Sequence, residues 1–435
     1  MAADLLRKFS MHYSRIIFFV LGMIGLVVHA TAATTSQTIT QPRVKLGIDV
    51  LSDSNFRALK DKRVGLLTHP AGVNAAGVPT VDLLFKAPKV KLVALYGPEH
   101  GVYGKAAADI AVDHNTDTRT GLPVYSLYGK TRKPSPQMLR GLDVMVVDLQ
   151  TLGVRSYTYT SCLRYVMEAC FSLGIEVMVL DRPNPYGGLK VDGPPMDKAW
   201  ISYVGAFQAP YVYGLTIGEL AKLLKASAGY LEIPDKVRAK GKLSVVPMAG
   251  WKRSMLWPDT GLTWVATSPY IPTVAAAFGY PMTGLGGQIG GFSHGIGSPY
   301  PFRLLNFKDK SPTDVLVALQ AKKIPGLGFK LQSYTNKYGE IKQGVYVVIN
   351  DWNQLRPTEL SFYMMTLTAQ WSAKNPFESA SSNEQSLFNK HVGSTAWWEE
   401  ISTRGAQARV PYFVDLWAKE AAAFQQWSQR FWLYH

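Results

Sequence analysis

Four short apolar runs, separated by segments of helical pattern, constrain the fold of this chain more than any other feature. Their Val, Leu and Met residues are nearly continuous, which is typical of strands buried on both faces of a parallel sheet. The runs are Arg63–Thr68, Val90–Tyr96, Asp143–Asp148 and Glu176–Leu180. Helices are expected between them, at Thr80–Lys86, Pro136–Leu142 and residues 160–173. This alternation predicts an α/β fold with a doubly wound parallel sheet.

The texture of the sequence changes near residue 250. Ten of the eleven Trp residues lie beyond it. Seven glycines fall within Gly284–Gly297, which predicts a long loop that covers a cleft between two domains. The expected elements are a helix at Pro312–Lys322, strands at Phe329–Tyr334 and Gln343–Ile349, and helices from Pro357 and Val414 onwards. We therefore predict a sheet domain over residues 45–250 and a second, smaller α+β domain over 251–435 that closes the cleft.

The N-terminus has the pattern of a secretory signal peptide. Basic residues (Arg7, Lys8 and Arg15) precede a thirteen-residue apolar run and then Ala30-Thr31-Ala32. That run is shorter than the roughly 20 residues of a membrane-spanning helix. We expect residues 1–32 to be a signal peptide, 33–44 a linker, and the mature protein to be periplasmic or extracellular after cleavage near Ala32. An uncleaved anchor is the alternative.

The formal net charge is +15, from 46 Lys and Arg against 31 Asp and Glu. Such a charge raises the question of a nucleic-acid partner. No Lys/Arg cluster, zinc spacing or recognition module accompanies it, so no nucleic-acid partner is expected. For an exported protein, general attraction to an anionic envelope accounts for the charge, with at most peripheral contact.

The sequence predicts neither a metal site nor a cofactor. His69, His100 and His114 lack the usual ligand spacing, and the glycines of 284–297 never complete a G-x-G-x-x-G phosphate loop. Cys162 and Cys170 lie eight residues apart on one expected helix, which separates their Cα atoms by about 12 Å. A disulfide requires less than about 7 Å, so we expect two free, buried thiols.

A group of polar residues follows each of the four apolar runs. In a parallel sheet the carboxyl ends of the strands meet at one edge, and ligands bind in the crevice outside that edge. We therefore expect the polar side chains of these groups to converge on one site. They are His69, Glu99, His100, Asp148, Gln150, Arg155, Tyr157, Asp181, Arg182 and Asn184.

Carboxylates, His, Asn, Arg and Tyr in one cleft suit hydrolysis of an oxygen-rich substrate, above all of a glycoside. Glu99 has no helix to cap and small neighbours around it, which favours a role as general acid. Asp148 or Asp181 would be the second carboxylate, and Arg155 or Arg182 would hold a substrate carboxylate. The alternative is structural: both aspartates would act as N-caps or as ion-pair partners of those arginines. The sequence leaves open whether the mechanism retains or inverts the anomeric configuration.

A second motif offers an alternative catalytic residue, a serine nucleophile. Gly291-Phe292-Ser293-His294-Gly295 matches the G-x-S-x-G nucleophile elbow of serine hydrolases. That elbow needs a strand before the serine and a helix after it. The glycines before Ser293 and the prolines after it predict neither, so we interpret this segment as part of a loop.

Five motifs in order resemble a known family. They are Gly97–Gly101, Thr120–Gly129, Gly153–Tyr159, Leu180–Pro185 and Gly214–Leu220. They are similar to those of the exo-β-N-acetylmuramidases called NamZ, glycoside hydrolase family 171, long known only as a bacterial domain of unknown function. The likeness runs from about Val44 to Tyr434, nearly the whole mature chain.

The resemblance implies a Rossmann-like N-terminal domain, a smaller C-terminal domain and an active cleft between them. It implies release of N-acetylmuramic acid from the non-reducing ends of peptidoglycan fragments, without metal or nucleotide. The family glutamate maps to Glu99. The expected partners are therefore peptidoglycan fragments or muramyl sugars, while the sequence gives no oligomeric state.

The sequence departs from the family pattern at four positions. Thr151 and Tyr270 stand where the family usually has Asp and Asn, and Gln288 and Ile296 replace a glutamate and an arginine. Gln288 cannot act as acid or base, so we count it among the substrate-binding candidates. The departures motivate an alternative function, that of a non-catalytic peptidoglycan- or sugar-binding protein on the same scaffold.

Overall fold

The structure is a computed structural model that describes residues 44–104 and 115–435. The predicted signal peptide, nearly all of the predicted linker and His114 lie outside the described residues. Within these ranges, no helix combines the length and apolar character needed to cross a membrane.

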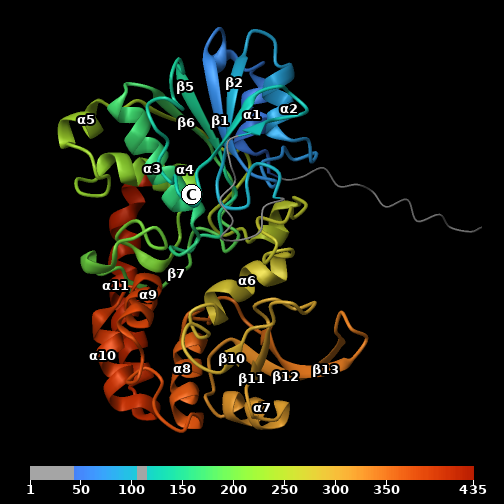
Figure 1. Ribbon diagram of the computed structural model, residues 1–435, viewed down its shortest axis with the longest axis vertical. Coiled ribbons are helices and arrows are strands. Elements are labelled where there is room, and N and C mark those ends of the chain that lie inside the picture. The colour runs from blue at the N-terminus through green and yellow to red at the C-terminus, as the bar shows by residue number, and fades with distance from the viewer. Residues whose placement is uncertain (1–43, 105–114) are drawn as a thin grey trace, which may run out of the picture. The chain divides into compact units, whose positions relative to one another are not determined.

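The first part of the chain alternates strands and helices as predicted (Figure 1). A seven-stranded sheet has the order β3-β4-β2-β1-β5-β6-β9 and is parallel except for the β3–β4 pair. Its strands are β1 (Arg63–Thr68), β2 (Lys91–Gly97), β3 (Asn115–Thr116), β4 (Pro123–Ser126), β5 (Val144–Asp148), β6 (Glu176–Leu180) and β9 (Leu243–Val246). The helices around it are α1 (Gly47–Asp53), α2 (Thr80–Lys86), α3 (Tyr159–Ser172), α4 (Ile217–Ala226) and α5 (Asp235–Lys240).

Helices cover both faces of this sheet, and the central strand β5 shows why. All five of its residues are buried, because successive side chains point to opposite faces. Val144 and Val146 pack in one core with residues of α1 and α2. Met145 and Val147 pack in another with residues of α3 and α4. The prediction of a doubly wound, Rossmann-like parallel sheet is confirmed.

The rest of the chain adds a four-stranded antiparallel sheet and more helices, which confirms the rest of the fold-class prediction. The sheet has the order β10-β11-β13-β12, from β10 (Phe292–Ser293), β11 (Leu304–Phe307), β12 (Leu327–Thr335) and β13 (Ile341–Ile349). The helices are α6 (Val274–Thr283), α7 (Pro312–Gln320), α8 (Glu359–Trp371), α9 (Ser382–Val392), α10 (Thr395–Arg404) and α11 (Val410–Ser428). The domain division at residue 250 stays a prediction.

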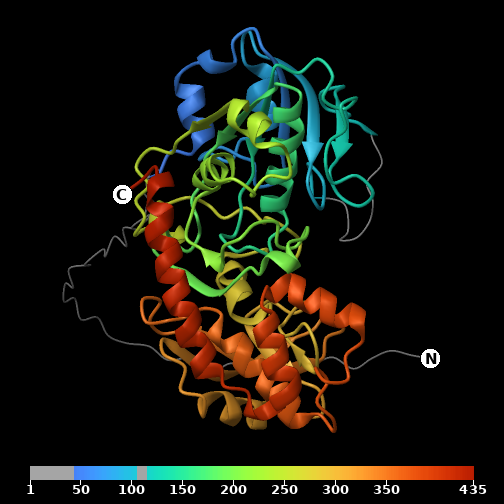
Figure 2. The ribbon, with the colours of Figure 1, turned by 90° about the vertical axis from the view of Figure 1, so that its left-hand side faces the viewer.

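One further pair of strands links these regions. β7 (Val191–Pro195) and β8 (Pro210–Tyr213) form a separate antiparallel ribbon. The long helix α11, drawn in red in Figure 2, packs on this ribbon and on α8. The loops of the parallel sheet and the C-terminal helices are thereby in direct contact.

The helix expected at Pro136–Leu142 is wrong. The segment forms overlapping turns, in which Leu139 N–H donates to Ser135 O, four residues back, and Leu142 N–H donates to Leu139 O, three residues back. Gly141, in the left-handed region with φ 78°, ends it before a second turn of helix can form. The cysteine prediction is confirmed: Cys162 and Cys170 are free and buried. Burial raises the pKa of both thiols to about 12, so both stay protonated at neutral pH.

Candidate active site

A cavity of about 610 Å³ lies between the loops at the carboxyl edge of the parallel sheet and helix α9. Among the described residues that line it, tyrosine is the commonest, and one carries a carboxylate, Glu99. Three predicted site residues take part: Glu99, His100 and Tyr157. The other lining residues are Tyr128, Arg132, Ser156, Thr158, Tyr159, Ser202, Tyr203, Val204, Ser268, Tyr270, Ile271, Tyr280, Phe302, Leu387, Lys390 and His391.

Glu99 lies in the tight turn that follows β2. His100 and Gly101 both adopt left-handed backbone conformations, with φ 69° and 75°, which bend the chain sharply after the glutamate. Gly97 has no room for a side chain, because a Cβ there would lie 2.7 Å from Val102 N. The Glu99 carboxylate is half-buried and accepts a hydrogen bond of 2.8 Å from the Thr158 hydroxyl. The turn and this contact fix the carboxylate on the cavity wall.

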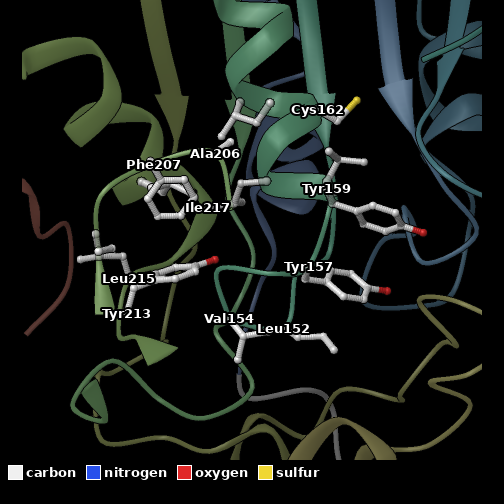
Figure 3. Packing of buried hydrophobic residues seen from close by; sticks show 14 of the residues in the cluster. Leu152, Val154, Tyr157, Tyr159, Cys162, Ala206, Phe207, Tyr213, Leu215 and Ile217 are labelled. Atoms are coloured by element: carbon white, nitrogen blue, oxygen red, sulfur yellow. The ribbon is translucent and has the colours of Figure 1, made fainter. Parts of the chain in front are cut away.

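Two adjacent tyrosines form part of that wall. The rings of Tyr157 and Tyr159 lie edge to face at 4.8 Å, and Figure 3 shows both hydroxyl groups on the same side. Both hydroxyls donate to Thr267, at 2.8 Å to Oγ1 and 2.6 Å to the carbonyl oxygen. Burial raises the pKa of both phenols well above 10, so they remain protonated. Aromatic rings at the surface of a cavity suit the apolar face of a sugar.

Asp148 does not reach the cavity. It is fully buried at the end of β5 and forms a two-point ion pair with Arg182, at 2.5 Å to Nε and 2.8 Å to Nη2. It also accepts a hydrogen bond of 2.5 Å from the Thr80 hydroxyl at the start of α2. The Arg182 guanidinium also donates a hydrogen bond to the carbonyl oxygen of Val73. Both residues lie outside the lining, and their contacts are those of an ion pair that ties strand ends together.

Asp181 is equally enclosed. It accepts hydrogen bonds from the Thr216 hydroxyl, the Gly218 amide at the start of α4, and the Tyr434 hydroxyl near the C-terminus, at 2.6–2.8 Å. Burial raises its pKa to about 6. Asp181 also lies outside the cavity lining, where it joins α4 and the C-terminal segment to the sheet.

Four further candidates support the loops from outside the lining. His69 Nε2 accepts a hydrogen bond of 2.9 Å from the Gln150 amide, which joins the ends of β1 and β5. The Gln150 side chain donates to Pro183 O, and that of Asn184 donates to Leu215 O. Gln288 donates to Gly284 O within its own glycine-rich loop. Neither this loop nor Ser293 lines the cavity, so the expectation of a loop over the cleft is wrong. Ser293 ends the two-residue strand β10, which the sequence did not predict, and the element that follows it is the strand β11, not the helix that a nucleophile elbow requires.

The burial of His69 predicts a specific pH dependence of stability. Burial, together with the nearby Arg182 charge, lowers the pKa of His69 to about 3. Between pH 6.5 and 3 the unfolded chain therefore binds a proton that the folded chain excludes, and stability falls as the pH falls. Relative to a His69→Gln variant, the wild type is expected to lose about 1.4 kcal/mol per pH unit in this window.

Urea unfolding of both proteins at pH 6.5, 5.5 and 4.5 measures this slope. A His435→Gln variant, changed at an exposed terminal histidine, is the matched control and should keep the slope of the wild type. Parallel stability profiles for the wild type and His69→Gln would contradict the prediction.

Arg155 is fully buried beneath the cavity wall and holds the end of α9. Its guanidinium donates to the carbonyl oxygens of Val392 (2.9 Å), Pro194 (3.3 Å) and His391 (3.4 Å). Such contacts satisfy the last carbonyls of a helix and interact favourably with its dipole. Burial lowers the pKa of Arg155 to about 10, which leaves it charged at pH 7. Arg155 thus positions α9, which carries three lining residues: Leu387, Lys390 and His391.

Replacing Arg155 by Met is expected to destabilise the protein by about 3 kcal/mol, because three buried carbonyls lose their donor. Because α9 loosens at the cavity, KM for a bound sugar should rise while kcat changes less. Urea unfolding and steady-state kinetics measure the two effects. The control is Arg140→Met at an exposed position. An increase in KM without loss of stability would instead indicate direct contact between Arg155 and the substrate.

Sequence reasoning missed most of the aromatic and basic lining. The sequence did mark Tyr270, because it stands where the family motif usually has Asn. In the structure the centre of its ring lies 6.4 Å from that of His100. Arg132 and Lys390 carried none, because they lie outside the strand-end motifs. Within residues 44–104 and 115–435, no group of three or more His, Cys, Asp or Glu side chains is placed to hold a metal ion.

Two family models match this chain. The model described as exo-beta-N-acetylmuramidase NamZ, N-terminal, matches residues 64–275, and its C-terminal counterpart matches residues 278–434. The chain belongs to the NamZ family. The peptidoglycan beta-N-acetylmuramidase NamZ of Bacillus subtilis (strain 168) is 42% identical over 337 residues, which cover 76% of this chain and 78% of that protein.

Solved structures agree with this NamZ assignment. A crystal structure of a DUF1343 family protein from Bacteroides fragilis is 41% identical, with a TM-score of 0.81 over 90% of this chain and 99% of that one. A second DUF1343 family protein from the same organism is 22% identical, with a TM-score of 0.67 over the same shares, and supports the fold alone.

Proposed function

We propose that this NamZ-family chain is an exo-β-N-acetylmuramidase. It hydrolyses the β-glycosidic bond of a terminal N-acetylmuramic acid and releases that sugar from the non-reducing end of a peptidoglycan fragment. The observation that carries the proposal is the Glu99 carboxylate, held at the wall of a tyrosine-lined cavity in a chain 42% identical to a peptidoglycan β-N-acetylmuramidase.

Glu99 is assigned the role of general acid. It donates a proton to the glycosidic oxygen as the bond from C1 to that oxygen breaks, water adds its hydroxyl group to C1, and the proton that the water loses restores the acid. The Thr158 hydroxyl orients the carboxylate, and the protonated Tyr157 and Tyr159 line the wall beside it. The burial and the saturated contacts of Asp148 and Asp181 favour structural roles for both over that of a second carboxylate.

The test is turnover of a chromogenic N-acetylmuramide by the purified protein. Release of the chromophore and of free N-acetylmuramic acid supports the enzyme. Binding to cell-wall sacculi without any turnover supports the alternative, a non-catalytic peptidoglycan-binding protein on the same scaffold.

We also propose that the protein is exported and works in the periplasm or outside the cell. The support is the N-terminal pattern of basic residues, a short apolar run and Ala30-Thr31-Ala32. N-terminal sequencing of protein recovered from the periplasm or medium should begin just after Ala32. Intact residues 1–32 on membrane-associated protein would support the uncleaved anchor instead.

A further inference from the structure

Among the described residues, the cavity lining contains two Lys or Arg side chains, Arg132 and Lys390, and neither is among the site residues predicted from the sequence. Arg132 is exposed on one part of the wall, and Lys390 is half-buried on α9. Burial lowers the pKa of the neighbouring His391, whose imidazole is therefore neutral at pH 7. The described lining residues include one carboxylate, that of Glu99, so their fixed charge is positive. A cavity of this charge favours an anionic ligand.

The surroundings of the two cations differ. The guanidinium of Arg132 lies 4.4 Å from the centre of the Tyr203 ring, itself part of the wall and stacked on Tyr165. Lys390 lies in the last turn of α9, whose final carbonyls are bound by the buried Arg155. The helix end therefore does not need Lys390 as a cap, and no ion pair within the described residues involves Lys390 or Arg132.

We infer that Arg132 and Lys390 form the subsite that binds the lactyl carboxylate of the sugar, an inference that rests on the proposed function. N-acetylmuramic acid differs from N-acetylglucosamine in its 3-O-lactyl group, which ends in a carboxylate. An enzyme that selects the first sugar must recognise this group, and charge-assisted hydrogen bonds are the strong means of doing so. Arg155 and Arg182, the arginines predicted for this role, are buried with other partners.

Steady-state kinetics on two substrates test the subsite. One is a chromogenic N-acetylmuramide, and the other is the same compound with its lactyl carboxylate converted to the uncharged carboxamide. Arg132→Met and Lys390→Met should each raise KM for the carboxylate substrate about tenfold, and the double variant should raise it further, with kcat changed less than about threefold. For the carboxamide the wild type should already have the high KM, and the variants should leave it unchanged.

Two matched variants complete the design. Lys337→Met removes an exposed cation that also lies over a tyrosine ring, but outside the cavity, and should leave both KM values unchanged. Lys390→Arg keeps the charge and should retain most of the preference for the carboxylate. An unchanged KM for the carboxylate substrate in Arg132→Met and Lys390→Met overturns the inference, as does an equal increase for both substrates.

Direct binding separates this inference from the proposed function. If the wild type shows no turnover, the proposed activity fails, and calorimetry then compares N-acetylmuramic acid with N-acetylglucosamine as ligands. Preferential binding of the acid, lost in Lys390→Met, supports the subsite without any catalysis. Equal binding of the two sugars to the wild type rejects it.

Discussion

Replacing Glu99 by Gln is expected to lower kcat on a muramyl glycoside by about 10²–10⁴-fold, the usual contribution of a general acid. The amide keeps the size of the side chain, and its oxygen still accepts the hydrogen bond from Thr158. It cannot give a proton to the leaving oxygen. Circular dichroism and the thermal midpoint should match the wild type, because Glu99 is half-buried at a cavity wall and not part of the core.

The choice of leaving group makes this experiment specific to acid catalysis. A 4-nitrophenolate leaves with little need for protonation, whereas the sugar alkoxide of a disaccharide depends on it. Glu99→Gln should therefore lose far more activity on the disaccharide than on the 4-nitrophenyl glycoside. Thr158→Val removes the hydrogen bond to Glu99 but keeps the carboxylate. This variant should lose less activity than Glu99→Gln on both substrates. An equal loss on both substrates would mean that Glu99 has a role other than that of the acid.

The sequence predicted the sheet because buried parallel strands leave a signal that needs no long-range information. The runs Arg63–Thr68 and Glu176–Leu180 coincide with β1 and β6, and parallel pairing brings their ends to one edge. The same reasoning placed Glu99, His100 and Tyr157 near one another. Short, half-exposed strands such as β9 have no comparable run and were not predicted.

The direction of a side chain at a strand end could not be predicted. Thr68 and Asp148 are paired in register at the ends of β1 and β5, so both sit at the expected edge. The sequence does not show that Asp148 points toward Arg182 and away from the cavity. Lys390 was missed for a different reason: almost 300 residues separate it from Glu99, and only tertiary packing brings α9 to the wall.

The buried pair of Asp148 and Arg182 predicts the largest effect on stability. Asp148→Asn leaves the Arg182 charge buried without its counter-ion, and Arg182→Met leaves the carboxylate in the same state. Each is expected to lower the free energy of unfolding by about 3–5 kcal/mol, the usual cost of removing one partner of a buried ion pair. Urea unfolding measures the loss. The exposed pair of Arg356 and Asp415 provides the control, and Arg356→Met should change stability far less.

The double variant decides whether the pair acts as a unit. In each single variant the remaining charge is buried without a partner and destabilises the protein. Removing it as well, in Asp148→Asn combined with Arg182→Met, should lower the free energy of unfolding by much less than the sum of the single changes. Activity then separates structure from catalysis at this site. Under conditions in which Asp148→Asn remains folded, a structural aspartate leaves kcat within about tenfold of the wild type, whereas a second catalytic carboxylate would reduce it by the 10²–10⁴-fold expected for Glu99. If Asp148→Asn kept the stability of the wild type but lost kcat by 10²–10⁴-fold, Asp148 would be a catalytic carboxylate and not a structural one.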